Sequence, residues 1–271
     1  MNNEIIQPPV LQTYNDEAIY AADLCKYFDK QPAVKNVSFQ VKQGEFFGFL
    51  GPNGAGKSTT IRMLCGMLPP DTGGARVAGY EVATQILELK RVVGVLPDEP
   101  QLYERLTGYE HLIFSGQMYG LTKSEADQRA RQLLELMQLT GDYKKMIVDY
   151  SLGMKKKIAL ACALIHRPRV LFLDEPFNGI DPISVRVLRD AMHQMTQHGT
   201  TIFISSHVME VVEKLCTRIA VINHGSIVGI GTVEELREMS ESAEGSSLED
   251  IFLKMVDART DSGAFDWLQE G

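Results

Sequence analysis

The sequence has few of the residues that build disulfide frameworks or metal clusters. Its four cysteines, Cys25, Cys65, Cys162 and Cys216, form no close pair among 271 residues, which favours buried, reduced thiols. No apolar run approaches the roughly 18 residues that a membrane-crossing helix needs. The first residues contain neither a basic leader nor an apolar stretch, so we expect no signal peptide. These absences predict a chain that is soluble by itself.

An excess of basic residues is also missing. The chain has 27 Lys and Arg against 35 Asp and Glu, which gives a net charge of -8. Proteins that wrap a nucleic-acid backbone usually carry a basic excess, so we expect no nucleic-acid partner. The hydrophobic fraction of 44% and the charged fraction of 23% are ordinary for a globular protein and exclude a fibrous or wholly disordered chain.

Composition divides the chain into three segments. Residues 1–17 are polar, contain Pro8 and Pro9, and predict a flexible N-terminal extension. Residues 18–239 alternate strands and helices and predict one domain. Residues 240–271 contain a spacer, a helix and a tail with the single tryptophan, Trp267, which either forms a lid on its own domain or contacts a partner.

Strands and helices alternate along the predicted domain. The segment FFGFL, residues 46–50, is almost wholly apolar, as a strand buried on both faces would be. The alternation predicts an α/β fold with a mostly parallel central sheet, which a helical insert from about 102 to 165 interrupts. Three pairs, Ser124 with Asp127, Thr232 with Glu235 and Ser247 with Asp250, predict helix starts with capping boxes.

A glycine-rich loop carries the strongest chemical signal. The segment GPNGAGKST, residues 51–59, matches G-x-x-x-x-G-K-[ST] and lies between a predicted strand and a predicted helix. Its glycines let backbone N–H groups turn inward around phosphate oxygens, Lys57 would reach the outer phosphates, and the Ser58 hydroxyl would hold Mg²⁺. The nucleotide-binding candidates are Gly51, Pro52, Asn53, Gly54, Ala55, Gly56, Lys57, Ser58 and Thr59.

A second signal is an acidic pair at the end of a buried strand. The segment VLFLDEP, residues 170–176, delivers Asp174 and Glu175 to the carboxyl edge of the sheet, where doubly wound sheets bind ligands. Asp174 is suited to hold Mg²⁺ through water. Glu175 is suited to orient and deprotonate the water that attacks the nucleotide.

The order of the motifs resembles the ATP-binding subunit of ABC transporters over roughly residues 18–235. The resemblance rests on the phosphate loop, the segment YSLGM at residues 150–154, the acidic pair and His207 after the strand TIFISSH. It implies a P-loop NTPase fold of the ABC ATPase type. In that fold a mostly parallel central sheet is joined by an antiparallel β subdomain and an inserted α-helical subdomain.

The resemblance also implies roles for single residues. Ser151 and Gly153 occupy the signature motif, which contacts the γ-phosphate of ATP held by the other subunit. His207 matches the histidine that contacts the γ-phosphate, and Asp181 lies in the loop that links the two ATP sites of the dimer. Phe28 falls where an aromatic ring stacks on adenine, although Tyr27 or a plain core position are alternatives there.

The chain departs from the family pattern at two places. Asp98, in GVLPD, stands where the family usually has a glutamine, and we expect it to keep a role at Mg²⁺ as an anion. Leu152 and Met154 replace a glycine and a glutamine of the signature, and the form SLGM is similar to the branch that exports drugs, lipids, polysaccharides and peptides.

The run Lys155-Lys156-Lys157 is interpreted as a solvated helix start, with a phosphate-facing role as the alternative.

These expectations converge on an ATPase subunit of an ABC transporter. It would form a homodimer around two ATP molecules with Mg²⁺ and drive transport, with export favoured, through separate transmembrane permease subunits. Its place would be peripheral, at the cytoplasmic face of the membrane. The alternatives are a soluble ABC-type ATPase that acts on ribosomes or DNA, and a nucleotide kinase or switch GTPase. The sequence does not identify the transported substrate.

Overall fold

The computed structural model describes residues 16–243 and 245–256. Most of the predicted N-terminal extension, and the tail with Trp267, lie outside these residues. Within them, no helix is both long and apolar enough to cross a membrane. All four cysteines are described; none is in a disulfide, and burial raises the pKa of the thiols of Cys65, Cys162 and Cys216.

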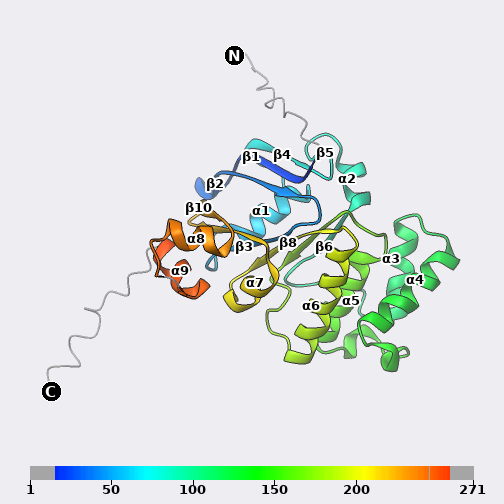
Figure 1. Cartoon of the computed structure of the whole chain (residues 1–271). Coiled ribbons are helices and arrows are strands. Elements are labelled where there is room, and N and C mark those ends of the chain that lie inside the picture. The colour runs from blue at the N-terminus through cyan, green and yellow to red at the C-terminus, as the bar shows by residue number, and fades with distance from the viewer. Residues whose placement is uncertain (1–15, 244, 257–271) are drawn as a thin grey trace, which may run out of the picture.

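A six-stranded sheet forms the centre of the molecule (Figure 1). Its strand order is β10-β9-β3-β8-β7-β6; the pairings among β9, β3, β8, β7 and β6 are parallel, and β10 pairs antiparallel with β9. The mostly parallel sheet that the sequence predicts is therefore confirmed. The strands are β3 (Phe46–Leu50), β6 (Val93–Leu96), β7 (Val170–Asp174), β8 (Thr201–Ser206), β9 (Arg218–Asn223) and β10 (Ser226–Gly231).

A second, antiparallel sheet covers one face of the central sheet. Its strand order is β2-β1-β4-β5, which confirms the expected antiparallel β subdomain. Along β2, Val37, Phe39 and Val41 alternate with exposed residues and point into the core. The strands are β1 (Glu17–Phe28), β2 (Gln31–Lys42), β4 (Thr72–Val77) and β5 (Tyr80–Glu81).

Helices surround the central sheet, and α3 and α4 lie to one side, beyond α5 and α6 (Figure 1). Short 3-10 turns, η1 (Thr140–Asp142) and η2 (Ile147–Asp149), connect α4 to α5. The helices are α1 (Lys57–Leu64), α2 (Ile86–Val92), α3 (Gly108–Met118), α4 (Lys123–Leu136), α5 (Leu152–Leu164), α6 (Pro182–Gln197), α7 (Met209–Leu215), α8 (Val233–Met239) and α9 (Leu248–Met255).

Two of the three predicted capping boxes are confirmed. Thr232 with Glu235 begins α8, and Ser247 with Asp250 begins α9. The prediction for α4 is wrong, because that helix begins two residues earlier, with Thr122 as its N-cap and Glu125 as the reciprocal partner.

The apolar side chains of the central strands fill cores on both faces of the sheet. On the face toward the antiparallel sheet, five phenylalanine rings form a cluster whose neighbouring centroids lie 5.3 to 5.8 Å apart: Phe39, Phe47, Phe49, Phe172 and Phe203. Phe46, Leu171 and Leu173 point to the other face and pack with the core of α3 to α6. Because successive side chains of a strand alternate in direction, a sheet covered on both faces needs the unbroken apolar strand of residues 46–50.

Candidate functional site

A hollow of about 430 Å³ lies where the carboxyl ends of the central strands meet the glycine-rich loop. The loop follows β3 directly and leads into α1. The hollow brings residues of the loop together with side chains that follow β6, β7 and β8. Its lining is Ala33, Asn53, Gly54, Gly56, Lys57, Ser58, Thr59, Asp98, Glu175, Asn178 and His207.

Two positions of the loop have room for glycine alone. At Gly51, an added Cβ would lie 2.4 Å from the Ile222 carbonyl oxygen. At Gly56, the φ angle is +106°, and an added Cβ would lie 2.5 Å from the Ala33 carbonyl oxygen. Since both obstacles are backbone atoms, which cannot move aside cheaply, glycine is needed for the loop to wrap around an anion at the start of α1.

Lys57 is held inside this loop. Its side chain is 6% exposed, and the ammonium donates to the carbonyl oxygens of Gly51 at 2.8 Å and Pro52 at 3.2 Å. It also forms an ion pair with Glu175, with Nζ 3.1 Å from Oε1. The cation is therefore fixed at the mouth of the loop, where the outer phosphates of a nucleotide would lie.

The acidic pair ends β7 beside its neighbour β8. The Ser205 hydroxyl donates to Oδ1 of Asp174 at 2.6 Å, and the Glu175 N–H donates to the Ser205 hydroxyl at 3.1 Å. The φ angle of Glu175 is +46°, a left-handed conformation that non-glycine residues seldom adopt. This turn aims the Glu175 side chain into the hollow, where Oε2 accepts the His207 N–H at 3.3 Å and lies 2.9 Å from Nδ1 of that ring.

Eight predicted site residues are not part of the lining of this hollow: Phe28, Gly51, Pro52, Ala55, Ser151, Gly153, Asp174 and Asp181. Gly51, Pro52 and Ala55 belong to the glycine-rich loop itself, and Asp174 ends β7 next to Glu175; the other four lie elsewhere. Ser151 is the exposed N-cap of α5 and accepts the Met154 N–H at 3.3 Å. Gly153 packs against the start of α6, since an added Cβ would lie 2.5 Å from the Ser184 hydroxyl oxygen and 2.9 Å from a carboxylate oxygen of Asp181. Phe28 is 50% exposed, so it is not the core aromatic of the alternative interpretation.

Asp181 acts as the N-cap of α6. It accepts the Ser184 N–H at 2.9 Å and the Ser184 hydroxyl at 2.7 Å, and these bonds hold the pKa of the Asp181 carboxyl below its usual value. The signature corner (Ser151 and Gly153) thus lies beside the start of α6, next to Asp181.

The lysine run behaves differently from its solvated interpretation. Lys155 is partly exposed and pairs with Glu104 at 2.6 Å, but Lys156 and Lys157 are buried, at 1% and 6% exposure. The prediction is therefore wrong for these two residues. A usable signal was the helical spacing, because Lys156 precedes the buried residues Leu160 and Leu164 by one and two turns on the same face.

Lys156 contacts both an expected site residue and the backbone of another. Its ammonium donates to the Glu175 carbonyl oxygen at 2.7 Å and lies 3.4 Å from Oδ1 of Asp98. Burial lowers the pKa of Lys156, and the Asp98 carboxylate acts in the opposite direction. Sequence reasoning missed this contact, because the two partners come from distant strands.

The oxygen ligands in and beside the hollow suit a hard cation together with phosphate oxygens. Ser58 and Asp98 line the hollow and Asp174 is buried directly before Glu175; they offer hydroxyl and carboxylate oxygens, which are the ligands that Mg²⁺ prefers. Within residues 16–243 and 245–256, no three His, Cys, Asp or Glu side chains form a group that would hold a metal by themselves. Mg²⁺ fits such a site, because it usually combines one or two protein ligands with water and substrate phosphates.

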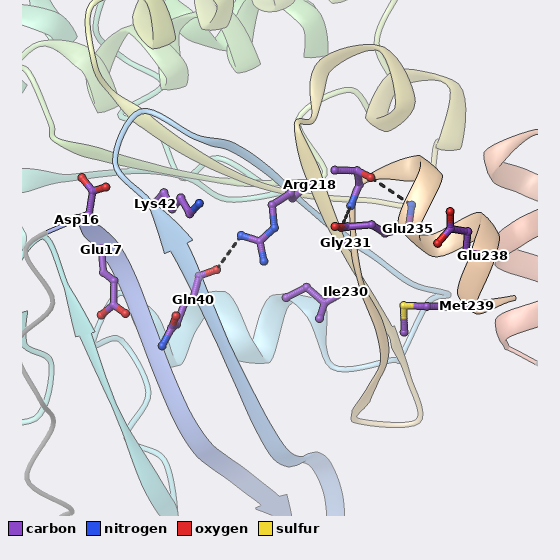
Figure 2. A pocket seen from close by; sticks show the side chains of 11 residues that line it. Asp16, Glu17, Gln40, Lys42, Arg218, Ile230, Gly231, Glu235, Glu238 and Met239 are labelled. Carbon is purple, nitrogen blue, oxygen red and sulfur yellow. Dashed lines mark hydrogen bonds between the residues drawn. The ribbon is translucent and has the colours of Figure 1, made fainter.

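Another hollow, of about 850 Å³, lies between β2, β10 and α8 (Figure 2). Arg218, at the start of β9, crosses it and donates to the Gln40 carbonyl oxygen. This position is at the amino end of the parallel strands, opposite the glycine-rich loop. None of the predicted site residues is in its lining.

The loop between β3 and α1, with its lysine and with an acidic pair at the end of β7, defines the class of P-loop proteins that bind and hydrolyse nucleoside triphosphates. In the sheet, β8 lies between β3 and β7. Comparison with known proteins narrows the class. Residues 34–178 match the family model described as ABC transporter, and the chain belongs to this family. The family assignment confirms the expected ABC-type fold, ATP binding and ATP hydrolysis.

Relatives and solved structures agree with that assignment. The chain is 44% identical to the linearmycin resistance ATP-binding protein LnrL of Bacillus subtilis over 218 residues, which are 80% of this chain and 70% of the relative. It is 35% identical to the daunorubicin/doxorubicin resistance ATP-binding protein DrrA of Streptomyces peucetius over 250 residues, 92% of this chain and 74% of the relative. A solved structure of the ATP-binding subunit of an ABC transporter superposes with a TM-score of 0.82 at 31% identity, covering 88% of this chain and 99% of the other.

Proposed function

We propose that two copies of this chain form the motor of an exporter at the cytoplasmic face of the membrane, where ATP closes the pair and hydrolysis reopens it. The observation that carries this proposal is the separation of two half-sites on one chain. Lys57, Glu175 and His207 line one hollow, whereas the signature corner, with its exposed Ser151, lies at the start of α5 and outside that hollow. A second copy would supply its signature corner to the first copy's hollow, which the first copy's own corner does not reach.

The hollow is equipped for attack of water on a terminal phosphate. Lys57 and the loop N–H groups hold the phosphates, and Glu175 accepts a proton from the attacking water while ADP departs as the leaving group. His207 fixes one oxygen of Glu175, which leaves Oε1 to face Lys57. Ser58, Asp174 and Asp98 would hold Mg²⁺, which would neutralise charge on the phosphates.

The signature corner fits a role in the partner's ATP site. An N-terminal hydroxyl, a closely packed glycine and the positive end of the 13-residue helix α5 together favour an anion. Asp181, beside this corner, would connect the two sites across the dimer. Because ATP would gain contacts from both copies only when they are closed, it has the differential affinity that a population shift requires.

The surface after Asp98 is suited to receive a permease subunit. Tyr103, Phe114 and Met118 are exposed, and the Tyr103 and Phe114 rings contact each other edge to face at 5.2 Å. These apolar side chains follow the Asp98 segment and lie on and before α3. We place the docking site of the transmembrane subunits here, beside Asp98.

Export is favoured over import by the form of the signature and by the relatives. LnrL and DrrA are both named for resistance to a toxic compound, and the SLGM signature resembles the export branch. No observation favours action on ribosomes or DNA, and the family assignment does not support a nucleotide kinase or a switch GTPase.

The Glu175→Gln variant tests this proposal. It removes the base but keeps the shape, so we expect the ATPase kcat to fall by about 100-fold or more and the ATP-loaded dimer to accumulate. Steady-state hydrolysis and light scattering after gel filtration measure the two effects. The matched control is Glu213→Gln on the exposed face of α7, which should hydrolyse ATP normally. A Glu175→Gln protein that stays monomeric in ATP, or that keeps its kcat, would contradict the proposal.

A further inference from the structure

The ammonium of Lys156 is a buried charged group that the proposed mechanism leaves unused. It lies 1% exposed on α5, and burial of a charge is costly unless the charge is paired and hydrogen-bonded. Both partners of Lys156 belong to the ATP site: the Glu175 carbonyl oxygen at 2.7 Å and the Asp98 carboxylate at 3.4 Å. An apolar side chain of similar volume would fill the same space without the cost of burying a charge.

The contact with Glu175 acts at a strained point of the backbone. Glu175 has a φ angle of +46°, and such a left-handed conformation persists in a non-glycine residue only where its surroundings hold it. Its N–H donates to the Ser205 hydroxyl at 3.1 Å and its carbonyl accepts from Lys156. The N–H also donates to the Ser205 carbonyl oxygen at 3.2 Å, and the carbonyl oxygen also accepts the Asn178 N–H at 3.2 Å. Bonds from β8, from the turn itself and from the Lys156 side chain of α5 therefore fix the turn that aims the Glu175 carboxylate.

The contact with Asp98 acts at the rim of the same hollow. The Asp98 side chain is 42% exposed and lines the hollow, so its carboxylate adds negative charge near Asp174 and Glu175. Where the family usually has a neutral glutamine, this chain has an anion, and the cation of Lys156 offsets that charge. Lys156 also lies on α5, the helix whose first turn presents the signature corner.

We infer that Lys156 is a positioning residue for ATP hydrolysis: it holds the main chain of Glu175 in the turn that aims the base, and it pairs with Asp98. This inference rests on the proposed function, in which Glu175 is the base. The pair also joins the helix of the signature corner to the base in the same chain. Movement of α5 against a second copy would then shift the backbone of Glu175 through its hydrogen bond with Lys156.

The test is a double-mutant cycle of Lys156→Met and Asp98→Asn, with kcat and KM for ATP measured at saturating Mg²⁺. Methionine keeps most of the lysine volume without the charge. We expect Lys156→Met to lower kcat at least tenfold and Asp98→Asn about fivefold, with KM for ATP within about threefold in both, because the phosphate loop is untouched. In the double variant, the two losses should combine to less than their product.

Lys155→Met is the matched control, since it removes a lysine of the same helix that faces solvent and Glu104. Its kcat should stay within twofold of the wild type. Thermal unfolding of every variant separates a positioning effect from a loss of fold. If Lys156→Met does not unfold cooperatively, the kcat of Asp98→Asn tests the inference instead. The Asp98 side chain lies at the rim of the hollow and is 42% exposed, so this substitution should leave the fold intact.

The outcomes separate the two proposals. A Lys156→Met or Asp98→Asn protein that keeps its kcat within twofold, while Glu175→Gln abolishes hydrolysis, would overturn the inference and leave the proposed function standing. Losses that multiply independently would overturn the pairing of Lys156 with Asp98. Undiminished hydrolysis by Glu175→Gln would overturn the proposed function itself.

Discussion

One buried and one half-buried histidine show how single residues contribute to the pH dependence of stability. His111 is buried; its Nε2 has no hydrogen-bond partner among the described residues, and its Nδ1 lies 3.4 Å from both Ser115 Oγ and Cys162 Sγ. His166 stacks on Tyr119 with ring centroids 3.7 Å apart. Burial lowers the pKa of both imidazoles, so the folded protein holds them neutral.

Stability should consequently fall in mild acid. Because the folded pKa lies below the unfolded value of about 6.5, the unfolded chain binds more protons below that pH, and the stabilisation is complete only above it. We expect the urea midpoint to rise from pH 5 to about pH 7. In the His111→Gln/His166→Gln variant this rise should be smaller, whereas His193→Gln, at an exposed position, should keep it. An unchanged slope in the double variant would contradict this account.

Single residues also mark where sequence reasoning stops. The phosphate loop and the acidic pair were predictable, because consecutive residues spell out each of them. The burial of Lys156 was not, because its partners come 58 residues earlier, at Asp98, and 19 residues later, at Glu175. A charge run predicts solvation unless the fold supplies partners, and a sequence does not show which distant groups will meet.

At the scale of elements, the start of α4 shows two overlapping patterns in competition. Thr122 with Glu125 and Ser124 with Asp127 both fit a capping box, and the sequence alone does not choose between them. In the structure, Glu125 reaches back to the Thr122 N–H at 2.8 Å. Asp127 is engaged elsewhere, accepting hydrogen bonds from Tyr109 and Arg131. The longer glutamate therefore sets the first turn.

Alanine substitution at the two hydroxyl residues should distinguish these caps. Thr122→Ala leaves N-terminal amides of α4 unsatisfied, so we expect it to lower the free energy of unfolding by about 1 kcal/mol. Ser124→Ala, inside the exposed first turn, should change it by less than about 0.5 kcal/mol. Chemical denaturation of both variants measures the difference. Equal losses would contradict the assignment of Thr122 as the N-cap.

At the scale of the whole molecule, the parallel sheet explains why distant segments share a site. Strands β3, β6, β7 and β8 all point their carboxyl ends to one edge, so the residues after each strand meet there. That gathering was predictable from the alternation of strands and helices. The position of the signature corner was not derivable from strand order, since it depends on how the helices pack, and there the prediction relied on resemblance.

Mixing two inactive variants should show whether the corner works on a second copy. Lys57→Ala damages the loop, and Ser151→Asp keeps an N-cap but repels phosphate. In an equal mixture, half of the dimers would contain one intact composite site, so we expect up to about a quarter of the wild-type ATPase rate.

Mixing Lys57→Ala with Glu175→Gln provides the control, because every site in those dimers has a damaged loop or base. That mixture should stay inactive. If the Lys57→Ala and Ser151→Asp proteins together hydrolyse no more ATP than either does alone, the corner does not act in trans.

The free cysteines have a practical consequence for following such a dimer. A thiol reacts as its thiolate, and the raised pKa values of Cys65, Cys162 and Cys216 keep those thiols protonated at neutral pH. Cys25 is likewise buried. A cysteine introduced at an exposed position such as Ile183, on α6 close to Asp181, would react with a maleimide dye well ahead of the native thiols. Fluorescence between two dyes could then report the approach of the copies in an otherwise unmodified protein.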